Sequence, residues 1–414
     1  MSKTDALAKL NWIASLIAIS VALAIPLRAS GVAAEQAALG VALLGSMFLF
    51  VREPAIRKFA RQAIISPQAR VISLIFIAWV ITIFFSHNLF ASFKMGTRTG
   101  VFLLASMMIW ATLSHQQDAQ ELLKKTLIVA SLSFALIALM SLNGVPYIVT
   151  ILKLKYAESA APTTNIFKAF GVSTMCLIPV VIWAGRQLKG RWKYLAYSFP
   201  FLALTIIIMT SSRSALAGIL AMILAVILLM SIAHRRYVKS LVIGAVFTLI
   251  GAVTWLRFKE LGVLHVEGTY LPDWLIDPHR QNIWKFAYDR FLDHPWVGNG
   301  IDQINRLPGA KMPVPGLGDY AAFVPSHPHN WSMEILSETG LVGFLPLVFA
   351  LGFIVWRLTK DYIRTKDEAA LAKIALMTGF WSSALFNFSI WAAWWQLTLF
   401  ILFAILSSSR KPVP

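Results

Sequence analysis

Charged residues, acidic residues and cysteine are all scarce in this sequence. Only 14% of its 414 residues are charged, whereas 58% are hydrophobic. The single cysteine, Cys176, lies inside an apolar run, which excludes an intrachain disulfide and a Cys-x-x-Cys metal or redox site. Acidic residues are nearly missing from the apolar runs, with Glu35 the main exception. Cation-coupled transport would therefore lack its usual carboxylates.

Several catalytic motifs are also missing. The chain contains no Walker phosphate-binding loop, no Gly-x-Ser-x-Gly nucleophile elbow and no Asp-x-Asp pair. An enzyme that transfers sugars without an Asp-x-Asp pair has to stabilise a diphosphate leaving group with Arg and Lys instead of a divalent metal. We therefore predict a site without metal or cofactor.

What the sequence does have is a series of apolar runs close to the ~20 residues that cross a ~30 Å hydrocarbon core. They predict an all-α polytopic membrane protein with about twelve transmembrane helices. The first run shows no small-residue cleavage pattern, so we expect a retained helix and not a signal peptide. The predicted spans are 10–28, 33–51, 71–86, 99–114, 126–142, 169–185, 194–210, 214–233, 239–256, 340–357, 372–389 and 394–408.

The positions of the basic residues along the chain indicate why they outnumber the acidic residues. The chain has 37 Lys and Arg against 19 Asp and Glu, which in a soluble protein would suggest nucleic-acid binding. If the twelve spans alternate, however, most of the basic residues fall on one side. The positive-inside rule makes that side cytoplasmic, together with both termini. We therefore expect membrane lipids, and no nucleic acid, around this chain.

One connection is much longer than the others. Residues 258–338 carry Pro, Gly, His, Asp and aromatic residues, and connections of this length are usually functional. We therefore divide the chain into a first set of nine spans (1–257), one large external loop with short helices (258–338), and three last spans with a tail (339–414).

Arg213 stands in a polar gap between two apolar runs, Thr210-Ser211-Ser212-Arg213-Ser214, at the predicted external boundary. An arginine near the end of a span can simply snorkel to the interface. Here the positive-inside bias is violated and four hydroxyls accompany the charge. This combination suits a phosphate held at headgroup depth.

The segment from Asp277 to Phe291 predicts a helix, with Asp277 as its N-cap and Pro278 at its first position. Arg280 falls in the first turn, where free N–H groups and the helix dipole favour an anion. The apolar residues lie on one side at helical spacing, which indicates a helix in the membrane interface. The alternative is a packing helix with solvated charges.

The end of the loop carries Ser326-His327-Pro328-His329-Asn330. Two histidines at this spacing could ligate a metal, but no further ligands complete a site. As a general base, His329 would be kept neutral by neighbouring guanidiniums. His327 is the alternative base. Glu338, further along, either orients a neighbour or caps a helix.

Three segments together resemble the O-antigen ligase and polymerase superfamily of bacterial membrane glycosyltransferases. Their order around one long external loop is more specific than any one of them, and the N-terminal half matches only in hydropathy. The segments are Ser-Ser-Arg-Ser-Ala-Leu-Ala-Gly at 211–218, Arg-Gln-Asn-Ile-Trp from Arg280 leading into His-Pro-Trp-Val-Gly-Asn-Gly at 294–300, and His-Asn-Trp-Ser-Met-Glu-Ile-Leu-Ser-Glu-Thr-Gly-Leu-Val-Gly at 329–343.

The resemblance implies a GT-C-like helical fold in the bacterial inner membrane, with a periplasmic active site, and we expect a monomer. It also implies a glycan donor on undecaprenyl pyrophosphate and transfer without metal or nucleotide. The acceptor is the lipid A core in the ligases, another lipid-linked glycan in the polymerases, and a protein hydroxyl in a third branch. The late position of the large loop favours an O-antigen ligase.

Within this family Arg213 and Arg280 are expected to bind the donor pyrophosphate, and His329 to act as the base in one inverting displacement. Further substrate contacts are expected from His327, Asn330, Lys94, Arg98, Lys155 and Lys168. A different class, a transporter for lipid-linked sugars or a small anion, would also use external basic residues. It predicts charges through the bilayer midplane and repeated halves, and the sequence has neither.

Overall fold

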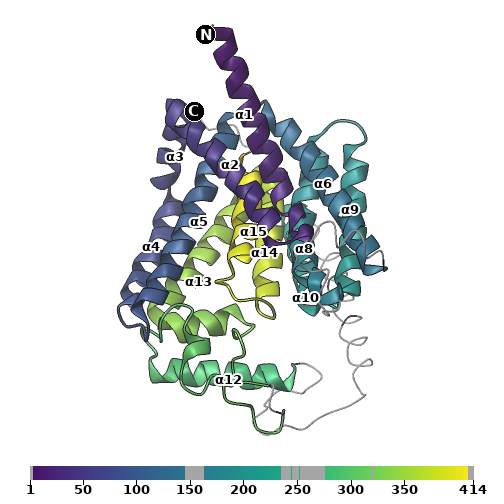
Figure 1. The fold of residues 1–414 in the computed structure, drawn as a ribbon. Coiled ribbons are helices and arrows are strands. Elements are labelled where there is room, and N and C mark those ends of the chain that lie inside the picture. The colour runs from purple at the N-terminus through teal and green to yellow at the C-terminus, as the bar shows by residue number, and fades with distance from the viewer. Residues whose placement is uncertain are drawn as a thin grey trace.

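The computed structural model describes residues 3–144, 163–234, 276–318 and 321–408, with Gly244 and Gly251. These ranges are almost entirely helical, and their one strand-like feature is an isolated bridge between Pro313 and Ala322. The elements shown in Figure 1 are α1 (Lys3–Ala24), η1 (Pro26–Ser30), α2 (Val32–Arg52), α3 (Pro54–Ile64), α4 (Pro67–Ile83), α5 (Leu89–His115), α6 (Ala119–Leu142), α8 (Thr163–Gln187), α9 (Trp192–Met209), α10 (Arg213–His234), α12 (Pro278–Asp293), η2 (Ile304–Arg306), α13 (Trp331–Thr365), α14 (Glu368–Ala384) and α15 (Ala393–Ser408).

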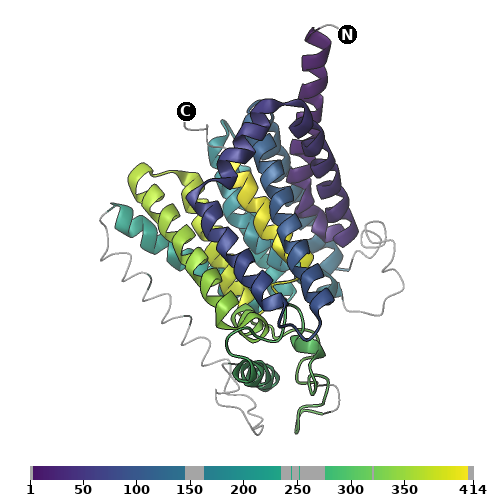
Figure 2. The ribbon, with the colours of Figure 1, turned by 90° about the vertical axis from the view of Figure 1, so that its left-hand side faces the viewer.

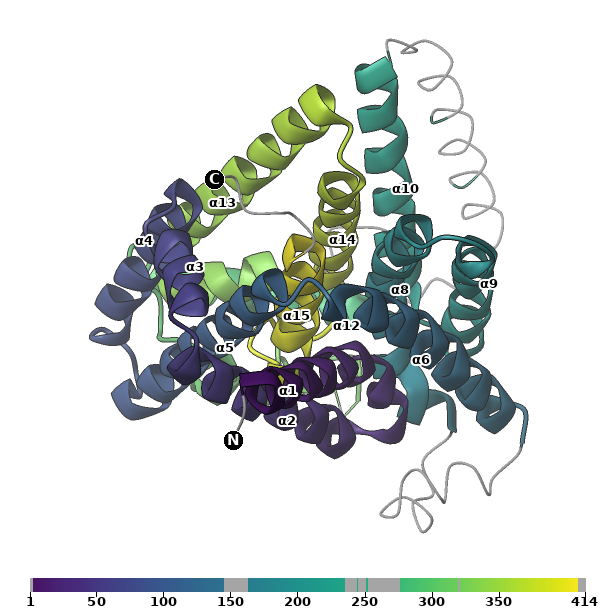
Figure 3. The same cartoon turned by 90° about the horizontal axis from the view of Figure 1, so that it is seen from above.

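Helices α14 and α15 form the centre of a helical bundle, and the other long helices surround them (Figure 3). Phe380 of α14 and Trp395 of α15 are fully buried and stack on each other with ring centroids 4.1 Å apart. α14 and α10 pack closely at Gly218. A Cβ added to this glycine would lie only 2.8 Å from the Gly379 carbonyl oxygen, so a larger side chain would not fit without a shift. This antiparallel contact places the start of α10 beside the end of α14.

Each predicted span within the described ranges coincides with a helix, and 239–256 lies outside them. Among the described helices, six are long and apolar enough to cross a membrane, or seven if the pair α3 and α4, bent by 66°, forms one broken span. The apolar parts of α1 and α15 are shorter. The chain is thus a helical membrane protein, while the count of twelve spans stays a prediction.

The end of the bundle that carries α12 lies opposite to the start of α1 and the end of α15 (Figures 1 and 2). Ile283 and Ala287, on the apolar side of α12, are buried in a small cluster with Ile304, Leu307 and Val324. These two residues therefore pack on the chain's own loop. For this part of its face the structure shows the alternative, a packing helix, while the position of the helix at the membrane surface stays a prediction.

Helix α13 is interrupted at Gly340, whose φ of 58° and ψ of −167° are not helical. A break leaves carbonyls before it without helical partners. The turn that follows α12 supplies those partners: the Asn299 N–H donates to the Ser337 carbonyl (3.1 Å) and the Gly300 N–H to the Glu338 carbonyl (2.8 Å).

The N–H groups after the break are satisfied by the same turn. Leu341 donates to the Pro295 carbonyl (2.9 Å) and Val342 to the Trp296 carbonyl (3.0 Å). We call these four backbone bonds the α13 clasp. Two of the segments that carry the family resemblance, 294–300 and 329–343, therefore contact each other along their backbones.

Candidate active site

The start of α12 has the local structure that the sequence predicted. The Asp277 side chain accepts hydrogen bonds from the backbone N–H groups of His279 (3.0 Å) and Arg280 (3.4 Å), and Pro278 occupies the first helical position. This cap holds Arg280 half-buried at the end of the helix that favours an anion.

The two predicted arginines lie near enough to interact. Burial is the main reason that the pKa of Arg280 is lowered; Asp277 opposes the shift and the positive charge of Arg213 adds to it. Arg213 is exposed at the first position of α10. In the described part of the chain, neither arginine forms a salt bridge with an acidic residue. Two such cations favour a ligand with two negative charges.

The histidine segment is held in place by hydrogen bonds from two other parts of the chain. The Trp284 indole N–H of α12 donates to the Pro328 carbonyl at 2.9 Å. The Asn305 side chain donates to the Ser326 carbonyl at 2.6 Å. His329 has a φ of 55°, a left-handed conformation that neighbouring contacts must maintain.

The two imidazoles differ in their hydrogen bonds. His329 Nδ1 lies 3.2 Å from the Asn387 carbonyl oxygen, in the connection between α14 and α15, and a carbonyl can only accept. Nδ1 therefore carries the proton and Nε2 holds the free lone pair. His327 Nδ1 bonds the Ser326 hydroxyl at 2.9 Å, and its ring centroid lies 4.2 Å from that of His329. The geometry favours His329 as the proton acceptor.

Both imidazoles are held neutral. Burial is the main cause that lowers the pKa of His329 to about 3, and His327 and Arg280 lower it further. Burial lowers the pKa of His327 to about 4, with a contribution from Arg280 in the same direction. We predicted a neutral His329 from neighbouring guanidiniums; Arg280 does contribute, but desolvation has the larger effect.

Asn330 is the N-cap of α13. Its Oδ1 accepts from the Ser332 N–H (3.0 Å), the Met333 N–H (3.3 Å) and the Ser332 hydroxyl (2.7 Å). These contacts explain why a helix begins directly after the histidines. The carbonyl side of the amide is therefore occupied by the helix, which leaves only its NH₂ group for the predicted substrate contact.

Two buried glutamates of α13 tie the site to the rest of the bundle. Glu334 accepts from the Ser389 hydroxyl (2.6 Å) and the Ile390 N–H (2.8 Å), both in the connection between α14 and α15. Glu338 accepts from the N–H groups of Asp302 (2.8 Å) and Ile304 (3.2 Å). Glu338 also accepts from the Trp391 indole N–H at 2.6 Å.

Of these two, the sequence singled out only Glu338, and capping was one of its two predicted roles. It orients neighbours from distant parts of the chain and does not cap its own helix. Glu334 was missed. The signal was two acidic residues at i, i+4 on an otherwise apolar helix, which share one face.

The structure gives the other predicted substrate residues different surroundings. Lys155 lies outside the described residues. Lys94 and Lys168 are exposed. Arg98, half-buried on α5, donates to the Trp391 carbonyl and interacts electrostatically with Asp302. Arg98 thus helps to hold the connection between α14 and α15, while a substrate role for these cations stays a prediction.

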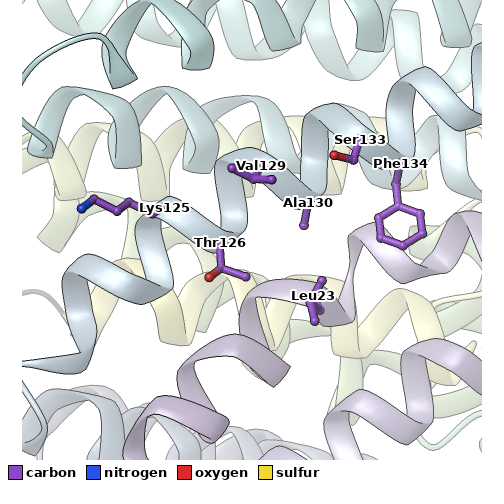
Figure 4. A pocket seen from close by; sticks show the side chains of 7 residues that line it. All are labelled: Leu23, Lys125, Thr126, Val129, Ala130, Ser133 and Phe134. Atoms are coloured by element: carbon purple, nitrogen blue, oxygen red, sulfur yellow. The ribbon is translucent and has the colours of Figure 1, made fainter.

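Two apolar cavities of about 380 and 390 Å³ lie away from these residues. The first lies between α1 and α6 and includes Leu23, Ala130 and Phe134 (Figure 4). The second is lined by residues of α4 and α13. Neither includes an arginine or histidine of the candidate site.

Comparison with known proteins supports the resemblance. Residues 199–348 match a family model described as O-antigen ligase, and this region includes Arg213, Arg280 and His329. A candidate polysaccharide ligase of Rickettsia prowazekii is 24% identical over 157 residues, 37% of this chain and 38% of that protein. A candidate polysaccharide ligase of Rickettsia typhi is 22% identical over 227 residues, 50% of this chain and 55% of that protein.

The matches thus span between about a third and about half of the length of these relatives. The family model nevertheless covers all three segments that carry the sequence resemblance in full. The resemblance inferred from the motifs is confirmed: residues 199–348 of this membrane protein match the family model described as O-antigen ligase.

Proposed function

We propose that this protein is an O-antigen ligase of the bacterial inner membrane, with its site at the periplasmic face. It transfers a glycan from undecaprenyl pyrophosphate to a sugar hydroxyl of the lipid A core. The observation that carries this proposal is the grouping of two arginines, neither in a salt bridge within the described residues, with a neutral His329 whose Nδ1 is already hydrogen-bonded. The family match supports the same class of substrate.

In this mechanism Arg213 and Arg280 bind the diphosphate of the donor. The acceptor hydroxyl oxygen attacks the anomeric carbon of the first donor sugar while its proton passes to His329 Nε2. The bond from the anomeric carbon to the phosphate oxygen breaks, and its electron pair leaves with the diphosphate. The two arginines stabilise that developing charge. One displacement inverts the configuration of the anomeric carbon.

The test of the function is a reconstitution. Purified protein, undecaprenyl-pyrophosphate glycan and lipid A core are combined with EDTA and without nucleotide, and the lipopolysaccharide is examined by gel shift. Ligated product is expected. A lengthened lipid-linked glycan instead would identify a polymerase, and a glycosylated protein acceptor would identify the third branch. Lack of transfer, together with movement of the lipid-linked glycan across vesicles, would replace the proposal by transport.

Replacing Arg280 by alanine is expected to lower kcat/KM about 10- to 100-fold. A hydrogen bond to a charged group contributes about 1.5–3 kcal/mol, and each ~1.4 kcal/mol corresponds to a factor of ten in rate. The initial rate of ligation measures this change. Lys285→Ala is the matched control, because this lysine on the same helix is 44% exposed and pairs with Asp289 at 2.7 Å. Equal losses in both variants would contradict a specific role for Arg280.

The pH dependence of kcat/KM should show that the general base stays unprotonated in moderately acidic solution. Since the pKa of His329 is lowered to about 3, mainly by burial, kcat/KM should stay level from pH 7 to about 5. A histidine with the ordinary pKa of ~6.5 would lose about tenfold per unit below that value. In kcat the acid limb should lie at higher pH, because the bound diphosphate favours the imidazolium. A kcat/KM limb centred near 6.5 would contradict this prediction.

A further inference from the structure

We propose that Glu334 is a positioning residue that fixes the tautomer of His329 through the connection between α14 and α15. The assignment of a catalytic proton acceptor to His329 rests on the function proposed above. The effect of Glu334 on the tautomer does not, because it follows from contacts that exist whatever reaction the protein performs.

The first step is the placement of Glu334. Its side chain is 1% exposed and lies on the first turn of α13. Its two carboxylate oxygens accept from the Ser389 hydroxyl and the Ile390 N–H. The Trp391 N–H in turn donates to the Ser389 oxygen at 3.0 Å, so this hydroxyl directs its own proton to the carboxylate. Burying a carboxylate costs free energy unless hydrogen bonds compensate for the lost water, and here these two donors provide that compensation.

The second step is the connection itself. α14 ends at Ala384 and α15 begins at Ala393, so the peptide carbonyls between them are not oriented by a helix. Asn387 lies only two residues before Ser389, and its carbonyl is the one that accepts from His329 Nδ1. By holding Ser389 and Ile390, Glu334 holds this carbonyl toward the imidazole.

The third step is the chemistry of the imidazole. A neutral histidine has one protonated nitrogen, and the hydrogen bond made by one nitrogen decides the state of the other. With the Asn387 carbonyl in place, Nδ1 of His329 keeps the proton and Nε2 offers a lone pair. If the carbonyl turns away, both tautomers are populated. In the Nε2–H tautomer the nitrogen facing the acceptor could not take up a proton.

The tautomer can be measured directly by ¹⁵N NMR of the full-length protein in detergent, with histidine labelled in the ring. The signals of His329 are assigned from their loss in His329→Gln. The unmodified protein should show Nδ1 protonated and Nε2 not protonated. Glu334→Ala should populate the Nε2–H tautomer as well. An unchanged spectrum in Glu334→Ala, or Nε2–H in the unmodified protein, would overturn the proposal.

Two further variants keep this measurement informative. Glu338→Gln is the matched control, because Glu338 is equally buried on the same helix but reaches the connection only through the Trp391 side chain, and bonds neither Ser389 nor Ile390. It should leave the His329 tautomer unchanged. If Glu334→Ala does not fold, Ser389→Ala removes only the hydroxyl donor and should shift the tautomer in the same direction.

Kinetics then test whether Glu334 acts through His329. Glu334→Ala is expected to lower kcat about 10- to 100-fold, the usual effect of losing a group that orients a functional side chain, with KM for the lipid-linked donor nearly unchanged. Glu334→Gln should restore part of the rate. A double variant with His329→Ala should be no slower than His329→Ala alone. Additive losses would mean a separate structural role. The NMR spectrum reports the tautomer whether or not the protein is active. A protein with the expected spectra but no ligase activity would therefore contradict the proposed function and not the role of Glu334.

Discussion

A His329→Ala protein should lose about 10²- to 10⁴-fold in kcat, the usual contribution of a positioned general base. The loss should fall mainly on kcat, because the arginines that bind the donor are still present. His329 presents Nε2 as the free lone pair, since Nδ1 is held by the Asn387 carbonyl at 3.2 Å. Single-turnover ligation with preloaded donor measures the chemical step apart from binding.

His327→Ala is the comparison for this variant. The two rings are neighbours, with centroids 4.2 Å apart, so both substitutions remove similar volume from the same place. The Nδ1 of His327 bonds the Ser326 hydroxyl, so we expect the smaller loss in His327→Ala. Undiminished ligation by His329→Ala, or a product that retains the donor's anomeric configuration, would refute the assigned role.

Replacing Gly340 by alanine should destabilise the protein by about 2–5 kcal/mol. The left-handed φ of 58° costs a residue with a Cβ about 1–2 kcal/mol, and forced overlap adds about 1–3 kcal/mol. The overlap is unavoidable, because the new Cβ would lie 2.4 Å from the carbonyl carbon and oxygen of Trp296. Gly298 has the reciprocal position, with its Cβ 2.4 Å from the Glu338 carbonyl. Both glycines therefore keep the α13 clasp closed.

The midpoint of thermal unfolding in detergent, together with the monodisperse fraction in size exclusion, measures this effect. Gly318→Ala is the matched control, because Gly318 also has a positive φ of 83° but a Cβ there would meet nothing within 4 Å. It should show the conformational penalty alone. If both variants lose the same stability, close packing at the clasp contributes nothing and only the backbone conformation matters.

Local features of the site could be predicted from the sequence because their causes lie within one or two helical turns. The cap at Asp277 and Pro278 and the position of Arg280 followed from residue types at fixed spacing, and the structure confirms them. The helices of the described spans followed in the same way from apolar runs. The expected span began at 340, which is where α13 breaks, and the helical stretch from Trp331 to this break precedes that span.

Contacts between distant segments could not be predicted in this way. Glu334 bonds residues 55 and 56 positions later, and Glu338 bonds Trp391, 53 positions later. Arg98, predicted to contact substrate, donates to the carbonyl of that same tryptophan. A single sequence carries no periodic signal for such pairs, because the packing of several helices brings them together.

The sequence by itself determined that this chain is a helical membrane protein and that it carries the arginine and histidine motifs of a glycan ligase family, because hydropathy and motif order need no tertiary contacts. Only the tertiary structure decided that Arg213 and Arg280 interact, that the two motif segments join along their backbones at Gly340, and that the Asn387 carbonyl fixes the proton on His329. The physical reason is that each of these depends on the distance and direction of groups brought together by α10, α12, α13 and α14.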